Sequence, residues 1–412
     1  MAEYFDTLET RDPELREREQ LARLPRQIAH AKARAPAFAR FLAAVDPAAV
    51  TTRDALARLP VTRKSELLEL QKAGRPFGGF AATRWGEAAR VFASPGPIYE
   101  PEGKRPDYWR LARALFAAGF RKGDLVHNGF SYHFTPAGSM VETGAHALGC
   151  TVIPGGTGQT EQQVQVMAEL KPDGYAGTPS FLKIIVEKAD EMGVRLASLT
   201  KALVSGEAFL PNQRDVLAAR GIAGYQTYAT ADVGAIAYET EAREGLVIDE
   251  GVMVEIVRPG TGDPVAPGDV GEVVVTTLFN TDYPLIRFGT GDLSALLPGT
   301  SPCGRSNLRI KGWMGRADQT TKVKGMFVHP EQVAAIVRRH PEIAKARLVV
   351  DNAQGSDRMT LNVEVAANRS SNAEAIVASI RELTKLRGEV AFRAPGELPN
   401  DGKVIDDVRR FD

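Results

Sequence analysis

Residues 271–293, GEVVVTTLFNTDYPLIRFGTGDL, carry the features that decide the fold. Residues 272–278 are rich in valine and threonine, which is typical of a buried strand. A break at residues 282–284 is followed by a short apolar run that ends in Gly289, Thr290, Gly291 and Asp292. Glycines before an aspartate let the chain bend tightly and present a carboxylate at a strand end. Such a carboxylate can accept hydrogen bonds from two neighbouring hydroxyls, as on a ribose. An aspartate that caps a turn is the simpler alternative.

The composition is that of a globular protein with two domains. The chain has 412 residues, of which 43% are hydrophobic and 25% charged. Its 51 basic and 51 acidic residues balance, which argues against nucleic acid or an anionic membrane as the main partner. No run approaches the ~20 apolar residues of a membrane span, and the charged N-terminus is unlike a signal peptide. Cys150 and Cys303 make neither a disulfide framework nor a metal cluster, so we expect a cytoplasmic location.

Strands and helices alternate along most of the chain, which predicts an α/β architecture with largely parallel sheets. Near the N-terminus, residues 13–38 predict an amphipathic helix that is interrupted at Pro25. Later helices are expected at 107–119, 137–148, 160–170 and 181–192. Strands are expected at 124–128, at 150–154, where the strand should be buried, and at 174–179. Residues 347–351, 360–366 and 372–386 predict two strands and a helix of a small α+β domain. The expected division is a large domain over 1–317 and a small one over 318–412.

The quoted stretch also carries a family resemblance. It resembles the adenylate-forming enzymes, most closely the phenylacetate–CoA ligase branch, in which a strand GE(L/V)V-x-T-x-L leads into P(L/I)IRYRT(G/R)DL. The resemblance covers nearly the whole chain. It implies the adenylate-forming fold, with a mobile C-terminal lid hinged at Asp318 in a GR-x-D segment. The family's ribose-binding aspartate falls on Asp292 and its motif arginine on Arg287, whereas Gly289 replaces its second arginine.

Other motifs are nucleotide-binding by the same resemblance. Residues 225–232, YQTYATAD, align with a Y-G-x-(S/T)-E motif, so Tyr228 would stack on adenine. Asp232 replaces the family's glutamate, a Mg²⁺ ligand, with a side chain one methylene shorter; a strand–turn with an aspartate cap is the alternative. The family's catalytic lysine falls on Lys403, although a lone lysine near a C-terminus is usually solvated. The remaining nucleotide-binding positions implied are Gly206, Glu207, Ala229, Thr230 and Arg316.

The phosphate loop of the family is altered in this chain. Residues 90–101, RVFASPGPIYEP, stand where the family has A-S-S-G-T-T-G-K-P, and Ser94 and Gly96 are kept as nucleotide-binding residues. Two hydroxyls and a lysine are lost, and their hydrogen bonds to phosphate would contribute about 5–9 kcal/mol of binding free energy. This loss is comparable with the whole binding free energy of a millimolar-to-micromolar nucleotide site, which is ~4–8 kcal/mol. Glu100 takes the place of the lysine and would repel phosphate if it faced the ligand. Lys104 and Arg105 are near enough in sequence to replace the lost charge; a surface turn is the alternative.

The function implied is ATP-dependent acid–CoA ligation. A carboxylic acid and ATP would give acyl-AMP and pyrophosphate, and coenzyme A would then displace AMP, with Mg²⁺ as cofactor. Tyr132, His133, Phe134 and Ala145 fall where the family lines its acyl pocket, which favours an aromatic acid and aromatic acid metabolism, with core packing as the alternative. The altered loop favours a second hypothesis, a relative that binds adenosine nucleotide or (acyl-)CoA without adenylating. A third is an enzyme that accepts preformed acyl-AMP or acyl-CoA. A homodimer is compatible with all three.

Overall fold

The structure is a computed structural model that describes residues 3–95, 97–317, 321–323, 326–352, 357–365, 372–399 and 403–409. The chain forms two compact units. The first consists of residues 1–254, 274–290 and 296–313, and the second of residues 255–273, 291–295 and 314–412. The predicted domain boundary at 317/318 lies close to the last division between the units, at 313/314. The boundary stays a prediction, because the second unit also includes residues 255–273 and 291–295. Within the described residues, no helix has both the length and the apolar character needed to span a bilayer.

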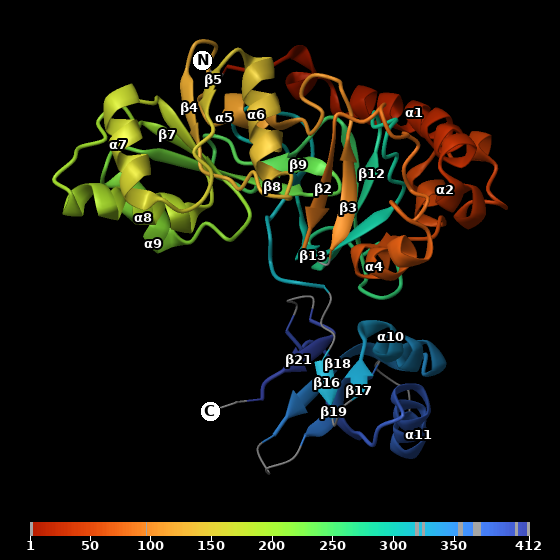
Figure 1. The fold of residues 1–412 in the computed structure, drawn as a ribbon. Coiled ribbons are helices and arrows are strands. Elements are labelled where there is room, and N and C mark those ends of the chain that lie inside the picture. Colours follow the sequence, from red (N-terminus) through yellow and green to blue (C-terminus); the bar gives the residue numbers. More distant parts are fainter. Residues whose placement is uncertain are drawn as a thin grey trace. The chain divides into compact units, whose positions relative to one another are not determined.

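The elements of the first unit follow one another as shown in Figure 1. Its helices are η1 (Thr7–Thr10), α1 (Pro13–Arg34), α2 (Pro36–Phe41), η2 (Pro47–Ala49), α3 (Arg53–Ala57), α4 (Lys64–Ala73), α5 (Leu111–Ala117), α6 (Ala137–Leu148), α7 (Thr160–Leu170), α8 (Pro179–Glu191) and α9 (Pro211–Ala218). Its strands are β1 (Thr62–Arg63), β2 (Arg90–Ser94), β3 (Ile98–Glu102), β4 (Leu125–Asn128), β5 (Thr151–Ile153), β6 (Gly174–Gly177), β7 (Lys201–Val204), β8 (Ala223–Thr230), β9 (Gly234–Tyr238), β10 (Leu246–Ile248), β14 (Leu296–Leu297) and β15 (Arg309–Ile310). The division between the units passes through β11 (Val252–Val257), β12 (Gly271–Thr277) and β13 (Phe288–Ser294).

A nine-stranded sheet organises the first unit, in the order β14-β15-β10-β9-β8-β7-β6-β4-β5. The strands from β8 to β5 pair in parallel, as predicted, and β8, β9, β10, β15 and β14 pair antiparallel. Successive residues of the parallel strands enter different cores, since side chains alternate across a strand. On β6, Ala176 joins a core with α5 and α6, whereas Tyr175 joins a core with α7, α8 and α9. The α/β prediction is confirmed.

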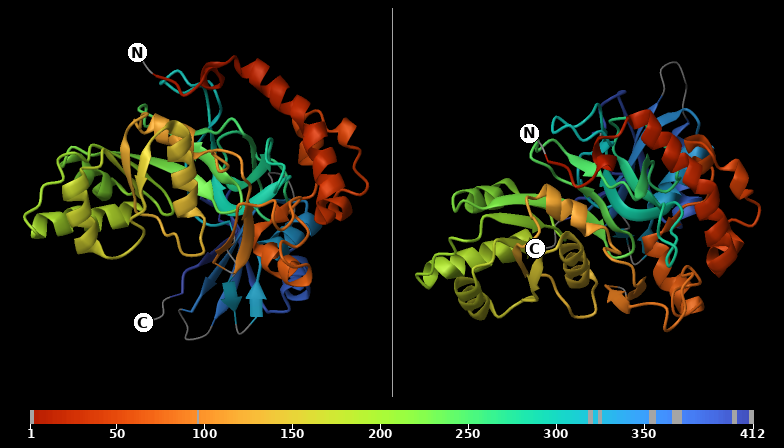
Figure 2. Two further views of the ribbon diagram at one scale, coloured as in Figure 1. Left: turned by 45° about the horizontal axis from the view of Figure 1, so that its top comes forward. Right: turned by 90° about the horizontal axis from the view of Figure 1, so that it is seen from above.

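Three expectations for the first unit are wrong. Helix α1 continues through Pro25 instead of breaking there (Figure 2), because the buried face with Leu24 and Ile28 outweighs the local cost of a proline. Strand β5 is not buried: it is the edge strand, and Thr151 is exposed. The helix expected at 107–119 covers only α5, because Asp107 and Arg110 have positive φ angles of 46° and 63°.

The second unit is the small α+β domain that the sequence predicts. It contains β16 (Thr321–Val323), β17 (Met326–Val328), α10 (Pro330–Arg339), β18 (Ile343–Asp351), β19 (Arg358–Val365), α11 (Ala373–Thr384), β20 (Glu389–Arg393) and β21 (Ile405–Asp407). A sheet in the order β20-β19-β18-β21 packs one face against α10 and α11 through Leu348, Leu361, Ile336 and Ile380 (Figure 1).

Candidate functional site

Asp292 and Arg316, predicted from distant motifs, meet in the second unit. Arg316 Nη1 donates to Asp292 Oδ1 at 2.9 Å, and the two residues also form a backbone bridge. Gly291 makes this possible, since its φ is +75° and an added Cβ would lie 2.9 Å from Arg316 Nη2. Asp292 is only 8% exposed. The prediction of a tight bend with Asp292 at a strand end is wrong, because Gly289, Gly291 and Asp292 lie inside β13. The strand nevertheless holds a carboxylate already paired with a cation.

In the first unit, Tyr228 contacts the quoted stretch. Its hydroxyl donates to Thr290 Oγ1 at 3.1 Å, and both side chains are buried. Tyr228, Ala229 and Thr230 end β8, and Thr230 Oγ1 accepts from the backbone N–H of Val233, which closes the turn to β9. The adenine-stacking role of Tyr228 stays a prediction.

Asp232 lies in that turn with no exposed surface, and its partner was missed in the sequence analysis. Lys64 Nζ donates to Asp232 Oδ2 at 2.5 Å, whereas Oδ1 is buried without a partner among the described residues. Lys64 begins α4, directly after β1, and β1 pairs in parallel with Phe288 and Gly289 of β13. The partners are 168 residues apart in the sequence, so no local signal indicated the pair.

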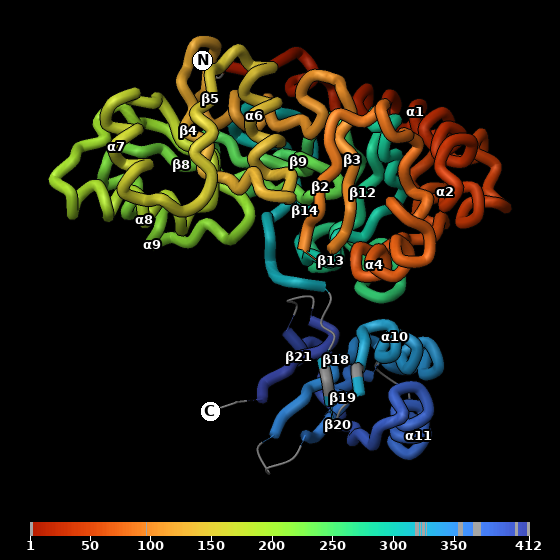
Figure 3. Tube along the Cα trace, in the orientation of Figure 1, coloured from red at the N-terminus to blue at the C-terminus, as the bar shows by residue number. Residues whose placement is uncertain are grey.

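The altered loop turns its acidic residue inward. Strands β2 and β3 run side by side as an antiparallel pair (Figure 3), and Glu100 on β3 is fully buried. Ser94 donates to it through both its hydroxyl and its backbone N–H. Burial, reinforced by the negative charge of Asp232, raises the pKa of Glu100 to about 8, while Ser94 and Lys64 oppose the rise. A protonated Glu100 carries no charge that could repel phosphate.

The cations proposed to replace the lost lysine point elsewhere. Lys104 Nζ donates to the carbonyl of Gly86 at 2.8 Å, and the Arg105 guanidinium donates to the carbonyls of Phe279 and Tyr108. Their replacement of the lost charge stays a prediction, and the lysine whose charge acts on Glu100 is Lys64. The sequence did contain a signal that Glu100 points inward. Every second residue of β3 lies on its buried face, and this set includes Ile98, Glu100 and Glu102.

Arg287, Gly206 and Glu207 have structural contacts. The Arg287 side chain is 1% exposed, and its Nη1 donates to the carbonyls of Ala57 and Leu59 at 2.6 and 2.5 Å. Glu207 Oε1 accepts from the backbone N–H of Ser180 at 2.7 Å in the first turn of α8, and Gly206 supplies a φ of +85° before it. The nucleotide-binding assignment of these three residues stays a prediction.

The four residues predicted to line an acyl pocket do not share one environment. Tyr132 hydroxyl donates to Glu142 at 2.8 Å and accepts from Asn128 at 2.8 Å. His133 is exposed, Phe134 is 80% exposed, and Ala145 is fully buried in the core beside α5. Their assignment as a substrate pocket stays a prediction.

Lys403 lies in the second unit, exposed, with its Nζ 2.9 Å from Asp406 Oδ1. A partner three residues away and at the surface restrains a lysine only weakly. The predicted hinge Asp318 and the loop residue Gly96 lie outside the described residues.

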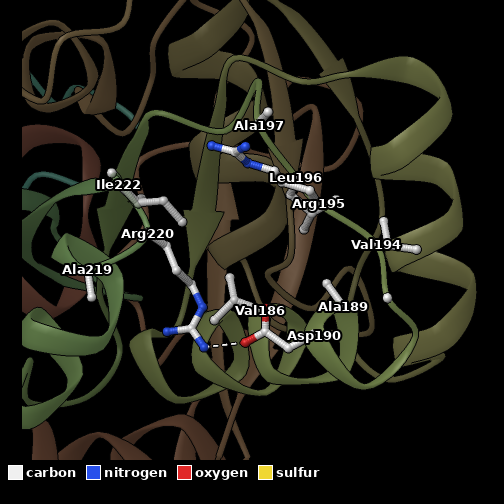
Figure 4. A pocket seen from close by; sticks show the side chains of 12 residues that line it. Val186, Ala189, Asp190, Val194, Arg195, Leu196, Ala197, Ala219, Arg220 and Ile222 are labelled. Atoms are coloured by element: carbon white, nitrogen blue, oxygen red, sulfur yellow. Dashed lines mark hydrogen bonds and ion pairs between the residues drawn. The ribbon is translucent and has the colours of Figure 1, made fainter.

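A cavity of about 670 Å³ lies at the end of α8 and beside α9, but it holds none of the predicted site residues. Figure 4 shows its apolar wall of Val186, Leu196 and Ile222, with Arg220 paired to Asp190. This cavity is separate from the residues described above.

Comparison with known proteins identifies the class of enzyme. The family model described as AMP-binding enzyme matches residues 114–280. The chain also superimposes on 2-hydroxyisobutyryl-CoA ligase in its postadenylation state with R3-HIB-AMP, with a TM-score of 0.72, 25% identity, and 97% of this chain and 91% of that chain covered. The same ligase with 2-HIB-AMP and CoA in the thioesterification state gives a TM-score of 0.70 with the same identity and coverage. The chain therefore has the fold of an adenylate-forming enzyme.

The curated relatives narrow the assignment. The chain is 33% identical over 379 residues to phenylacetate–coenzyme A ligase of Thermus thermophilus, which covers 88% of this chain and 84% of the relative. It is 34% identical over 363 residues to that of Aromatoleum evansii, which covers 84% and 81%. The chain belongs to the phenylacetate–coenzyme A ligase family.

Proposed function

We propose that this chain is an ATP-dependent acyl-CoA ligase that works through an acyl-adenylate. A carboxylate oxygen of the acid attacks the α-phosphorus of ATP and pyrophosphate leaves; the thiol of coenzyme A then attacks the acyl carbon, and AMP leaves. The observation that carries this proposal is the similarity to phenylacetate–coenzyme A ligases over more than four fifths of the chain. It favours a ligase over a relative that only binds nucleotide or acyl-CoA.

The proposed site residues have two kinds of role: some position the nucleotide, and one stabilises the charge that develops during the reaction. Asp292, held by Arg316, would accept the ribose hydroxyls, and Tyr228 would stack on the adenine. Lys403 would stabilise the negative charge that develops on the α-phosphate, because a positioned cation is worth most where charge develops. Its exposure leaves the ammonium accessible to a ligand.

The residues present fit a magnesium ion. One carboxylate oxygen of Asp232, Oδ1, has no partner among the residues that the structure describes. Mg²⁺ in nucleotide sites commonly takes one or two carboxylates together with phosphate oxygens. Bound there with Lys64 on the other oxygen, the ion would neutralise phosphate charge and polarise the α-phosphorus.

Three finer statements belong to the proposal. An aromatic acid is favoured by Tyr132, His133 and Phe134, which lie in the stretch where the family resemblance implies an acyl pocket. The two cysteines, both free and buried, support a cytoplasmic location. A homodimer is compatible with the chain, and sedimentation would test it.

The test is pyrophosphate release from ATP and Mg²⁺ over a panel of aromatic and aliphatic carboxylic acids with coenzyme A. Lys403→Ala is expected to lower turnover by at least about 100-fold, whereas Lys385→Ala, at an exposed lysine of the same unit, should leave it unchanged. No turnover with any acid, together with calorimetric binding of AMP or coenzyme A, would leave a binding protein and reject the ligase.

A further inference from the structure

The parallel part of the nine-stranded sheet reverses its strand order between β4 and β6. These two strands are neighbours, and the chain runs from β4 outward to β5, whereas β6, β7 and β8 follow one another on the other side. In open parallel sheets, ligands bind outside the carboxyl ends of the strands at such a reversal. The segments that follow Asn128 on β4 and Gly177 on β6 are therefore the expected place for a ligand in the first unit.

The segments after these strands lie beside a residue of the predicted nucleotide site. Gly129, directly after β4, donates its backbone N–H to the carbonyl of Ala176 on β6 at 2.8 Å. A Cβ added at Gly206, which follows β7, would lie 3.5 Å from Thr178 and 3.8 Å from Phe130. Because Gly206 is a predicted nucleotide-binding residue, an acid bound beside the segment after β4 would lie next to the nucleotide.

Tyr132, in the segment after β4, is held by both β4 and α6. Asn128 Nδ2 donates to the Tyr132 hydroxyl at 2.8 Å, and Asn128 is fully buried. The Tyr132 ring lies against Gly138 of α6, where an added Cβ would be 3.0 Å from two ring carbons. The Tyr132 hydroxyl in turn donates to Glu142 Oε2, one turn further along α6, at 2.8 Å. Strand, loop and helix therefore fix the positions of this tyrosine and of the Glu142 carboxylate.

The backbone of Phe134 holds the same loop against β2. Its carbonyl accepts from the N–H of Ala93 at 2.9 Å, and its φ of +60° is unusual for a bulky side chain. Strained residues of this kind concentrate at active sites and ligand clamps. Ala93 precedes Ser94 of the altered loop, so the segment with Tyr132 also adjoins the loop whose family counterpart binds phosphate.

Glu142 retains hydrogen-bonding capacity, whereas the Tyr132 hydroxyl has no proton left to donate to a ligand. Burial, reinforced by the hydrogen bond to Glu142, raises the pKa of Tyr132, so its single proton stays on the hydroxyl and is donated to Glu142. Glu142 is half-buried, and its Oε1 accepts from no residue that the structure describes. Arg90, whose positive charge acts on Tyr132, is paired with Glu102. A carboxylate offers acceptors only, so a ligand that reaches this pair has to supply the donor.

We propose that Glu142 determines the specificity of the ligase, by selecting a carboxylic acid whose acyl part carries a hydroxyl or amino group that donates to Glu142 Oε1. This inference rests on the proposed function and names the substrate class of its acyl site. An acid without such a group would cover the carboxylate and leave it without a partner, which costs more than the missing hydrogen bond alone. The requirement is compatible with an aromatic acid, because an aromatic ring can carry the donor.

The experiment compares acids that differ only in the donor. Phenylacetate is measured beside its hydroxy and amino derivatives, and propionate beside lactate and alanine, by pyrophosphate release with ATP, Mg²⁺ and coenzyme A. Calorimetric titration of the full chain with the same acids measures binding without turnover. The variant is Glu142→Gln, which keeps the shape and one oxygen for Tyr132 but removes the charge. Glu169→Gln, at an exposed glutamate of α7, removes the same charge elsewhere in the first unit and is the matched control.

The wild type should show a kcat/KM at least about tenfold higher for a donor-bearing acid than for its unsubstituted counterpart. Glu142→Gln should lower this preference by about fivefold to tenfold and change kcat/KM for the unsubstituted acid by less than about twofold, whereas Glu169→Gln should change neither. Equal turnover of both kinds of acid by the wild type, or an equal loss for both in Glu142→Gln, would overturn the inference. A carboxylate that only anchors the loop would affect all acids alike.

The inference and the proposed function can fail separately in this experiment. Absence of turnover, together with calorimetric binding that prefers donor-bearing acids and weakens in Glu142→Gln, would reject the ligase and support the specificity site. Turnover of unsubstituted acids alone would support the ligase and reject the site. Neither turnover nor saturable binding of any acid in the millimolar range would reject both.

Discussion

Glu100→Gln should make the protein more stable, and increasingly so as the pH rises. In the folded chain the pKa of Glu100 lies at about 8 instead of its ordinary 4.5, because the carboxyl is buried beside Asp232. Between these values the folded state keeps the proton and the unfolded state releases it, so stability falls as pH rises and levels off above about 8. One pKa unit corresponds to about 1.4 kcal/mol, so the loss amounts to a few kcal/mol, at most about 5. Glutamine keeps the shape and can still accept from Ser94, but it never ionises.

The assay is urea denaturation of the wild type and the variant from pH 5 to pH 9. The difference in free energy of unfolding should be small at pH 5 and should reach a few kcal/mol near pH 9. Glu102→Gln is the matched control, since Glu102 lies two residues away on β3 and is 1% exposed. It accepts from Ser139 and pairs with Arg90, so its substitution should lower stability instead. A Glu100→Gln advantage that stays constant or shrinks with pH would refute the assignment of a buried, protonated carboxyl.

Three further variants test contacts of the candidate site. Lys64→Gln leaves the buried carboxylate of Asp232 without its cation and should lower the free energy of unfolding by about 3–5 kcal/mol. Adding Asp232→Asn should recover most of this lost stability. A loss below about 1 kcal/mol for Lys64→Gln alone would contradict the importance of the Lys64–Asp232 ion pair. Gly291→Ala should raise KM for ATP, because the new Cβ would lie 2.9 Å from Arg316 Nη2 at a φ of +75°; an unchanged KM in steady-state kinetics would show that this geometry is dispensable. Arg287→Met should lower the free energy of unfolding by about 2–4 kcal/mol, measured by thermal or urea denaturation, because the carbonyls of Ala57 and Leu59 lose a buried charged donor. Unaltered stability would show that these hydrogen bonds do not stabilise the fold.

The fold could be predicted from the sequence where local signals were strong. Helices α6 and α7 begin and end at the predicted residues, since each has a clear periodic apolar face and a helix-ending residue. Predictions failed where long-range packing decided the outcome. The interior Pro25 is accepted by a helix that buries one face, and the start of α5 is delayed by backbone angles at Asp107 and Arg110 that no residue type there announces.

The candidate site was predictable in its motifs but not in its contacts. The family resemblance named Asp292 and Arg316, and the structure brings them within hydrogen-bonding distance. Glu100 was recognised as an anomaly, but its environment depends on Lys64 and Asp232, which approach through strand pairing between distant segments. The loop of the family suggested that Glu100 could face phosphate, whereas the structure buries Glu100 in the core and burial raises its pKa to about 8.

Each of the two units is built from three separate segments of the chain, and this limits where the polypeptide can be cut. The second unit takes residues 255–273 and 291–295 before its main segment begins at 314, so a single cut in the polypeptide cannot liberate either unit intact. A fragment ending at residue 313 would retain the two short segments while losing their packing partners, among them Gly315 and Ala317, which bond to Leu293 and Gly291. Cleavage or domain exchange with a relative at that point should therefore yield aggregation-prone halves, and functional chimaeras will require five junctions rather than one.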